Sequence, residues 1–420
     1  MQKVPQVTTI PVTGTWGTAD TATLTINGKD LTVTIGTDVD IADVVAAIVA
    51  AVNGTAIVSD ESRNDTGDNI PEFQDITASG TASPITLTGD SIGTPFTVTV
   101  SEDTASTGAL GTPTTTSGTP TGPNYLAAEN VTGGVLPAAA DTFTLENSNV
   151  SMLYGLDQSG AGTLTALNIK AGFTGSVGLP RYNTAGYVTY HDRYYQVRAS
   201  VVDIGQGDGA GSGRIQLDLG SVQSAITIHY TATSSETDVY AVRLIGTHAS
   251  NTLQAYGGSV DIAPEQGQVA TIATLNAAGS AKVRTGPGVT LTTVNVGGNA
   301  AVDITSAAGL ADITIITMEG TGVLYIRGDN AITTLVVLSG TCDFRSAGTV
   351  TNVRVGSAGV LDLTNSTQDV TFTNTSLTKG GLITDPQRRI TFTNAIDFGD
   401  AGLQDFPGLD LGRGLNILPS

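Results

Sequence analysis

Apolar and polar positions alternate in short runs through the C-terminal half of the chain, and these runs recur about every 20 residues. The clearest recurrence is the tetrapeptide Thr-Phe-Thr-Asn, which occupies residues 371–374 and again 391–394. A fixed period of this size predicts a solenoid, because one unit cannot bury its apolar face alone and must stack on its neighbours. The repeating segments begin near Val269, Val289, Leu310, Ala331, Thr349, Asp369 and Ile390.

Many of these units contain a triplet in which two apolar residues flank one residue that should face outward, because successive side chains of a strand point to opposite faces. The triplets are Ile215-Gln216-Leu217, Val260-Asp261-Ile262, Val302-Asp303-Ile304, Leu324-Tyr325-Ile326, Cys342-Asp343-Phe344 and Leu361-Asp362-Leu363. Two or three short strands per unit, separated by glycine turns, predict a mostly β chain that forms a right-handed parallel β-helix with coils about 4.8 Å apart. A leucine-rich repeat is the alternative for this period, but its Leu-x-x-Leu-x-Leu-x-x-Asn pattern is missing.

The first hundred residues predict a small α+β domain. Residues 21–26 and 31–35 alternate around Asn27-Gly28, which is a strong hairpin signal. Residues 41–52 place Ile41, Val44, Val45, Ile48 and Val52 on one face of a helix. Residues 85–87 and 96–100 are further strand candidates, which complete a unit of hairpin, helix and strands.

The remaining boundaries follow composition and period. Residues 101–124 are dominated by Thr, Gly, Ser and Pro and predict a linker, since such a segment cannot bury a core of its own. Residues 125–268 are strand-rich without a strict period, and they are interpreted as the first, broader coils of the solenoid; a separate β-sandwich is the competing interpretation. The regular coils then cover residues 269–408, and residues 409–420 form a C-terminal cap or tail that covers the exposed end.

Composition and charge exclude several classes of protein. Only 13% of the residues are charged, against about 25% in an average soluble protein. The net charge of −20 argues against nucleic-acid binding, which requires clustered Lys and Arg. The longest apolar stretch, residues 41–52, is shorter than the ~20 residues of a membrane span, and the N-terminus lacks the apolar core of an export signal. We therefore expect no membrane partner and synthesis in the cytoplasm.

The sequence offers little for catalysis, metal binding or cofactor binding. Cys342 is the only cysteine and occupies an inward triplet position, so we expect a buried thiol and no intrachain disulfide. The three histidines, His191, His229 and His248, are far apart and are interpreted as structural. Gly207-Asp208-Gly209 slightly resembles a calcium-binding glycine-aspartate repeat, but a single copy supplies too few oxygen ligands, so a turn is expected. No catalytic residue, cofactor or metal ligand is predicted.

Four outward aspartates, Asp261, Asp303, Asp343 and Asp362, should form a ladder along one face of the coils. Glycoside hydrolysis needs two carboxyl groups about 5–10 Å apart, which neighbouring coils could supply. An acidic stripe that discourages aggregation explains the same residues. The prediction is a non-enzymatic protein.

The densest candidate for an interaction surface is the segment from Arg181 to Arg198, which holds five of the eleven tyrosines. Tyr and Arg are enriched at the centres of protein interfaces. An aromatic cluster that seals the wide end of the solenoid is the alternative. The interface candidates are Arg181, Tyr182, Tyr187, Tyr190, Tyr194, Tyr195 and Arg198.

Two stretches resemble proteins of tailed phages. Residues 21–35 with the following Ala/Val helix resemble small domains of phage virion proteins, including tail sheath and tube proteins. Residues 130–143 and 154–159 with the coils beyond resemble β-helical proteins encoded among phage and prophage structural genes.

The resemblance implies a virion component made in the host cytoplasm, without fixing which one. From the rigid repeats joined to a small domain, we expect a capsid decoration protein, a cement protein or a head fibre. The expected partners are major capsid or tail proteins, and a homo-oligomer is expected, with a trimer as the commonest way to bundle such helices. A tail spike or receptor-binding β-helix that acts on cell-surface glycans is the alternative function, and a bacterial surface adhesin is a third.

Overall fold

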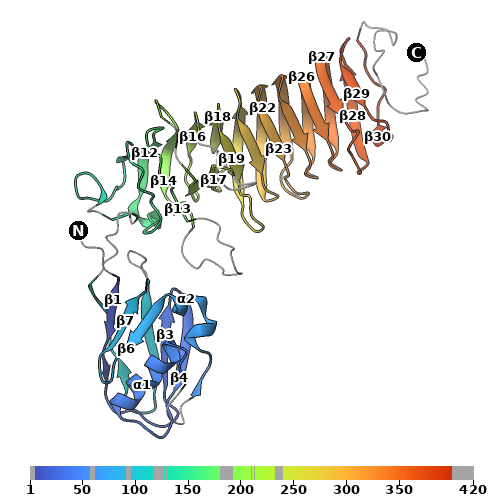
Figure 1. The fold of residues 1–420 in the computed structure, drawn as a ribbon. Helices are drawn as coiled ribbons and strands as arrows, with labels where there is room; N and C mark the ends of the chain where they lie inside the picture. Colours follow the sequence, from blue (N-terminus) through green and yellow to red (C-terminus); the bar gives the residue numbers. More distant parts are fainter. Residues whose placement is uncertain are drawn as a thin grey trace. The chain divides into compact units, whose positions relative to one another are not determined.

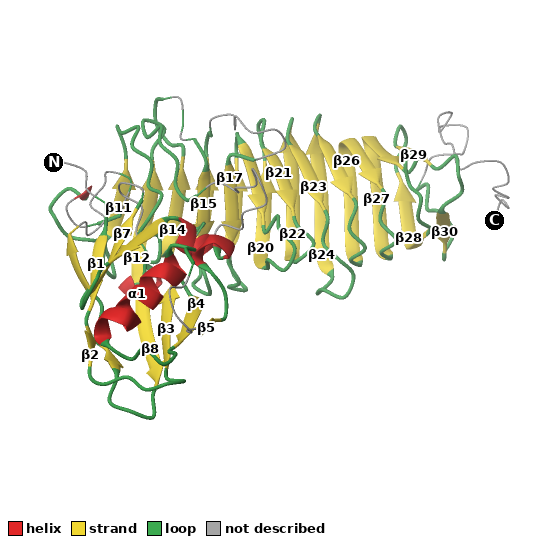
Figure 2. Cartoon of the chain, turned by 60° about the horizontal axis from the view of Figure 1, so that its bottom comes forward, coloured by secondary structure: helices red, strands yellow, loops and turns green. Residues whose placement is uncertain are grey.

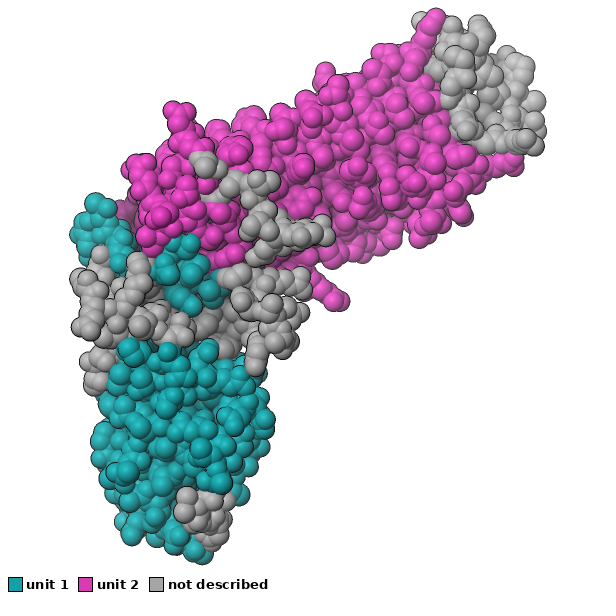
Figure 3. Space-filling model, in the orientation of Figure 1, with its two compact units in different colours: residues 1–136, 151–156, 179–193 teal, residues 137–150, 157–178, 194–420 magenta. Residues whose placement is uncertain are grey.

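The chain forms two compact units in the computed structural model, which describes residues 5–56, 62–90, 96–117, 124, 126–127, 130–179, 193–209, 211, 213–231 and 240–399 (Figure 3). Unit 1 comprises Met1–Leu136, Ser151–Leu156 and Leu179–Arg193, and unit 2 comprises Pro137–Val150, Asp157–Gly178 and Tyr194–Ser420. Strands account for 46% of the residues and helices for 7%, which confirms the mostly β prediction. No helix in the described part of the chain is long and apolar enough to cross a bilayer.

Unit 1 contains two antiparallel four-stranded sheets, with strand orders β10-β1-β7-β6 and β5-β4-β3-β8, and a short pair β2-β9. Helix α1 (Ile41–Val52) packs on the same core as both sheets, together with the short helices η1 (Gly67–Asn69) and α2 (Pro71–Gln74). The strands are β1 (Val7–Ile10), β2 (Val12–Thr13), β3 (Thr21–Ile26), β4 (Lys29–Thr34), β5 (Ser62–Arg63), β6 (Ile76–Ser79), β7 (Ile85–Gly89), β8 (Val98–Asp103), β9 (Ala109–Leu110) and β10 (Thr114–Ser117).

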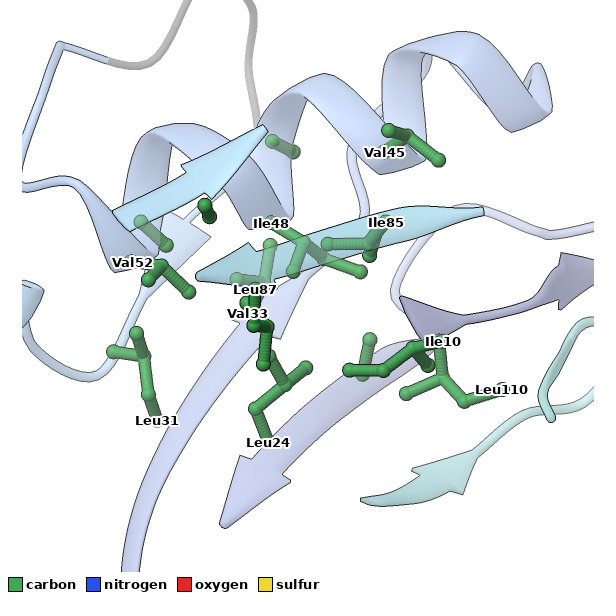
Figure 4. Close-up of a cluster of buried hydrophobic side chains, with 14 of the residues drawn as sticks. Ile10, Leu24, Leu31, Val33, Val45, Ile48, Val52, Ile85, Leu87 and Leu110 are labelled. Carbon is green, nitrogen blue, oxygen red and sulfur yellow. The ribbon is translucent and has the colours of Figure 1, made fainter. Parts of the chain in front are cut away.

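The predicted hairpin and helix of unit 1 are present. Strands β3 and β4 pair around Asn27 and Gly28, whose φ angles of 51° and 82° give the left-handed turn that this dipeptide favours. Helix α1 has the predicted bounds, and Figure 4 shows its side chains Val45, Ile48 and Val52 beside residues of β4 and β7. The local pattern of apolar and polar residues therefore predicts which side chains of β3, β4 and α1 form this core.

The linker predicted for residues 101–124 is wrong where the structure describes it. Strand β8 continues to Asp103 and pairs with β3, β9 pairs with β2, and β10 pairs with β1. A Thr-rich segment has no core of its own, but its backbone can add to an existing sheet edge and obtain its hydrogen bonds there. Residues 101–117 therefore complete unit 1.

Unit 2 is a parallel β-solenoid of about 10 turns (Figures 1 and 2). Its strands form two stacks, and in the described residues the strand pairings of the solenoid are parallel and join consecutive turns. Stack 1 consists of β11 (Thr142–Leu145), β12 (Thr163–Ile169), β14 (Arg198–Ile204), β16 (Ala225–Ile228), β18 (Thr252–Ala255), β20 (Ala270–Ala277), β22 (Val289–Gly298), β24 (Ile313–Gly320), β28 (Val370–Leu377), β30 (Ile390–Phe392) and the first parts of β26 (Ile332–Phe344) and β27 (Val350–Asp362). Stack 2 consists of β13 (Tyr195–Gln196), β15 (Ile215–Asp218), β17 (Val242–Ile245), β19 (Ser259–Ile262), β21 (Lys282–Thr285), β23 (Ala301–Ile304), β25 (Val323–Ile326), β29 (Leu382–Thr384) and the last parts of β26 and β27.

The predicted period matches the observed register. Ala270 pairs with Val289, Ile332 with Val350 and Val370 with Ile390, close to the segment starts found in the sequence. The strands between residues 142 and 262 belong to the same stacks, so this region holds the first coils and not a separate sandwich. The regular coils can be followed to Phe392, whereas residues 400–420, including the predicted cap at 409–420, lie outside the described residues.

The repeated Thr-Phe-Thr-Asn tetrapeptide has a direct structural reason. Thr371 and Phe372 pair with Thr391 and Phe392, so the two copies lie one above the other. The two Phe rings meet edge to face with centroids 6.1 Å apart, and the Asn394 side chain donates a 2.8 Å hydrogen bond to that of Asn374. Identical residues in register thus extend both the core and the hydrogen-bonded surface.

Polar side chains inside the corners bind main-chain carbonyls that would otherwise be buried without partners. Ser224 Oγ donates to Ala199 O and Ser306 Oγ donates to Val289 O, each at 2.7 Å. Such bonds let the backbone turn inside the solenoid without the cost of unpaired polar groups.

Candidate functional site

The middle residues of the predicted triplets form one continuous column on the outward side of stack 2. Strand pairing joins each member to the next in consecutive turns. The column, called here the charged column, consists of Gln216, Arg243, Asp261, Arg284, Asp303, Tyr325, Asp343, Asp362 and Thr384. The predicted aspartate ladder therefore exists, but arginines interrupt and accompany it.

Both carboxylate oxygens of Asp261 accept a hydrogen bond from one guanidinium. Arg284, its neighbour in the next turn, donates from Nε to Oδ1 at 3.0 Å and from Nη2 to Oδ2 at 2.6 Å. The side chain of Asp261 is fully buried, whereas that of Arg284 is 33% exposed. A paired geometry of this kind compensates the desolvation of a carboxylate that has left the solvent.

Asp343 has a similar partner from its own strand end. Arg345 donates to its two carboxylate oxygens at 2.7 and 2.6 Å. Because only Phe344 separates the two residues, their side chains point to the same face, and the guanidinium lies beside the carboxylate. Both aspartates therefore serve as anchors for arginine side chains on this face.

Asp303 has fewer polar contacts than Asp261 and Asp343 to offset the desolvation of its carboxylate. Arg327 contacts its Oδ2 at 3.2 Å, and its Oδ1 is buried without a hydrogen-bond partner among the described residues. Burial raises the pKa of Asp303, while the nearby guanidiniums of Arg327, Arg284 and Arg345 act in the opposite direction. Desolvation is the larger effect, so the carboxylate form of Asp303 is disfavoured in the folded protein.

Two tyrosine rings lie against arginines that pair with aspartates of the column. The guanidinium of Arg284 lies 4.6 Å from the ring centroid of Tyr240, and that of Arg327 lies 4.8 Å from the ring centroid of Tyr325. Burial also raises the pKa of Tyr240. These cation–π contacts add a second interaction to each guanidinium besides its carboxylate partner.

The described part of the predicted interface segment is mainly structural. Tyr195 is 1% exposed and pairs with Leu217, so it belongs to the interior. Tyr194 is buried as well, and its hydroxyl accepts a 3.1 Å hydrogen bond from Gln268. Arg198 donates to the carbonyl oxygens of Val197 and Asp218 at 3.4 and 3.3 Å.

The other four interface candidates, Arg181, Tyr182, Tyr187 and Tyr190, lie outside the described residues, as does His191. Of the seven candidates, the structure therefore places three, and these three do not form one exposed cluster.

The opposite side of the solenoid presents uncharged columns. From β18 to β22, Thr252, Thr274 and Thr293 lie in one outward register of stack 1. Gln254, Asn276 and Asn295 lie in the next, where the Asn295 side chain donates to that of Asn276 at 2.7 Å. Between β18 and β22, these two outward registers therefore carry polar side chains without charge.

The remaining candidates of the sequence are placed as follows. Cys342 is fully buried, and desolvation raises the pKa of its thiol. The described histidines lie in separate places, with His229 beside Asp203 and His248 accepting a hydrogen bond from the amide of Ser250. Within the described residues, no cluster of three or more His, Cys, Asp or Glu side chains could hold a metal ion.

The arginine partners were not found from the sequence. Arg284 occupies the middle of Val283-Arg284-Thr285, and this triplet ends in a polar residue, so it does not match the pattern of two apolar flanks. Alignment of the coils by register would have revealed the alternation of Arg243, Asp261, Arg284 and Asp303. Comparisons with protein-family models, with curated proteins and with solved structures found no match.

Proposed function

We propose that this protein is a structural component of a tailed-phage particle, as a capsid decoration or cement protein or as a head fibre. In this role unit 1 attaches the chain to major capsid or tail proteins, and unit 2 provides a rigid body. The resemblance of residues 21–35, 130–143 and 154–159 to phage virion proteins supports the location in a phage particle. The architecture of unit 2 supports the rigid body.

The observation that carries the proposal is the charged column. A functional site requires polar groups that are available to a substrate, whereas Asp261 and Asp343 are each held by both oxygens to an arginine. Arg327 likewise contacts Asp303. Arg284 and Arg327 thereby connect Asp261 and Asp303 to the following turn, and Arg345 occupies Asp343 within its own turn. These contacts favour a structural protein over the glycan-cleaving alternative.

Self-association belongs to the same proposal. A chain of net charge −20 repels its own copies, and the Thr and Asn columns of stack 1 between β20 and β22 are a face where that repulsion is weakest. We propose a homo-oligomer, with a trimer as the arrangement to test. Sedimentation equilibrium of the purified chain should give three times the monomer mass of 42.6 kDa, and a monomer mass at all concentrations contradicts this part.

The experiment on function is quantitative mass spectrometry of particles purified from the phage or induced prophage that encodes the chain. The expected result is the intact chain at a copy number comparable with that of known structural proteins. An abundant non-structural protein of the same lysate serves as the control for contamination. Particles that lack the chain, while the lysate contains it, would overturn the proposal.

A further inference from the structure

An exposed aromatic cluster lies on the outward side of stack 1, away from the charged column, and consists of His229, Tyr230 and Tyr256. Tyr256 and Tyr230 are 48% and 49% exposed, which makes them two of the most exposed large side chains among the described residues. The ring of His229 stacks on that of Tyr256, with centroids 5.9 Å apart and an angle of 27° between the planes. Large exposed rings of this kind mark a surface that contacts something else.

The strand register explains why the rings of His229 and Tyr256 are exposed. Ile204, Ile228, Ala255 and Ala277 pair in consecutive turns, so the residues that follow them, Gly205, His229, Tyr256 and Ala278, form the next column. Only hydrogen and methyl side chains therefore flank the two rings. The faces of the pair are left uncovered by the neighbouring turns.

Gly205 also fixes the position of Tyr230. Its φ angle is +78°, and a Cβ atom at this position would lie 1.7 Å from the carbonyl oxygen of Tyr230. The turn that carries His229 and Tyr230 thus rests directly on the backbone of the turn below. Main-chain packing therefore fixes the backbone that carries the aromatic surface.

Planar polar groups stand beside the rings in the adjacent outward register. Asp203, Thr227 and Gln254 occupy this register in three consecutive turns. Asp203 Oδ2 lies 3.3 Å from His229 Nε2, and the Tyr256 hydroxyl donates to Gln254 Oε1 at 2.9 Å. This second bond orients the amide of the exposed Gln254 with its NH2 group available as a donor.

We infer that these residues form a carbohydrate-binding subsite. Aromatic faces pack against the C–H faces of pyranose rings, and an amide group binds their hydroxyls, so the rings and the Gln254 amide offer both kinds of contact. Asp203 positions His229 and does not itself contact the ligand, because its Oδ2 lies 3.3 Å from His229 Nε2 and its Oδ1 is buried. The net charge of −20 disfavours a nucleic acid as the ligand.

A binding experiment tests this subsite independently of particle assembly. The purified full chain is applied to an array of bacterial lipopolysaccharides, capsular polysaccharides and peptidoglycan fragments, and affinities for any bound glycan are measured by titration. Tyr256→Ala should weaken binding by about tenfold, because it removes the stacking face. Tyr256→Phe should weaken it by about threefold, because the ring stays and only the hydroxyl that orients Gln254 is lost.

The matched control is Tyr325→Ala on stack 2, which should bind as the wild type does. Thermal melting checks that each variant is folded. Failure of the wild type to bind any glycan of the array, or equal binding by the wild type and Tyr256→Ala, overturns the inference. Incorporation into particles should be the same for Tyr256→Ala and the wild type, so this test and that of the particle role can fail separately.

Discussion

Asp303 and Asp343 occupy the same column two turns apart, yet their surroundings give opposite expectations. Asp343 accepts two charge-assisted hydrogen bonds from Arg345, whereas Asp303 has one arginine contact and one buried oxygen without a partner among the described residues. A carboxylate that is bound on both sides stabilises the fold, and one that is desolvated without full compensation opposes it. The contrast can be measured by neutral replacements.

Asp303→Asn is expected to raise the melting temperature at neutral pH. Because burial raises the pKa of Asp303 above its ordinary value of 3.8, the stability that its protonated form contributes is complete below 3.8. This contribution is lost as the pH rises through the folded-state pKa. Asn cannot ionise, so the advantage of the variant should be present at neutral pH and disappear below pH 3.8, as followed by calorimetry.

The control is Asp343→Asn, which removes the negative charge and one of the two oxygen acceptors of Arg345. It should lower the free energy of unfolding at neutral pH by about 1–2 kcal/mol, a value reduced for the partial exposure of Arg345. Destabilisation by both variants to the same extent, or by Asp303→Asn alone, contradicts this account of the column. Loss of a sugar-cleaving activity in both variants with unchanged melting would instead support the enzymatic alternative.

The turns of the solenoid are the elements through which stability is distributed. Each turn packs mainly on the one before and the one after, so a defect in one turn should remain local. Phe372 shows the packing well, because its ring lies 5.7 Å from that of Phe344 and 6.1 Å from that of Phe392. It is fully buried between these two turns.

Phe372→Ala is expected to cost about 3–5 kcal/mol locally, because it leaves a cavity between the edge-to-face rings of Phe344 and Phe392. Hydrogen exchange followed by mass spectrometry should show lost protection in β27, β28 and β30 and unchanged protection in β18 and β20. Thr371→Ala, next to it on the outward side, should leave all of these strands protected. A uniform loss of protection along the solenoid would show that a defect in one turn destabilises distant turns as well.

The whole molecule has two hydrophobic cores in two different architectures. Unit 1 encloses one core between sheets and a helix, and unit 2 encloses a long core inside the solenoid. Cores that are separate are expected to unfold in separate transitions. Trp16, the only tryptophan, is 1% exposed in the core of unit 1, so its fluorescence reports on that unit.

Unfolding in urea should therefore give different midpoints by tryptophan fluorescence and by far-ultraviolet circular dichroism, which is dominated by the strands of unit 2. Ile48→Ala, in the core of unit 1, should lower the stability of that unit by about 2–5 kcal/mol. It should shift the fluorescence midpoint and leave the main dichroism transition in place. If the fluorescence and dichroism curves coincide for the wild type and also for Ile48→Ala, the two units unfold in one transition.

The sequence by itself determined the elements whose cause is local. Alternation specified β3 and β4, Asn27-Gly28 specified their turn, and helical spacing specified α1. The period of about 20 residues specified the stacking of identical positions, which is why Thr371 and Thr391 pair as their repetition predicts. Each of these features depends on residues that are neighbours in the chain or that repeat at one fixed distance.

Tertiary structure alone decided the features that join unlike segments. Residues 101–117 became strands because sheet edges were available to them, and their own composition gave no sign of this. The partners of Asp261 and Asp303 depend on the number of residues in each turn, since one residue more or less brings a different side chain beside the carboxylate. The same holds for His229 and Tyr256, whose rings meet because turns of unequal length return to a common register.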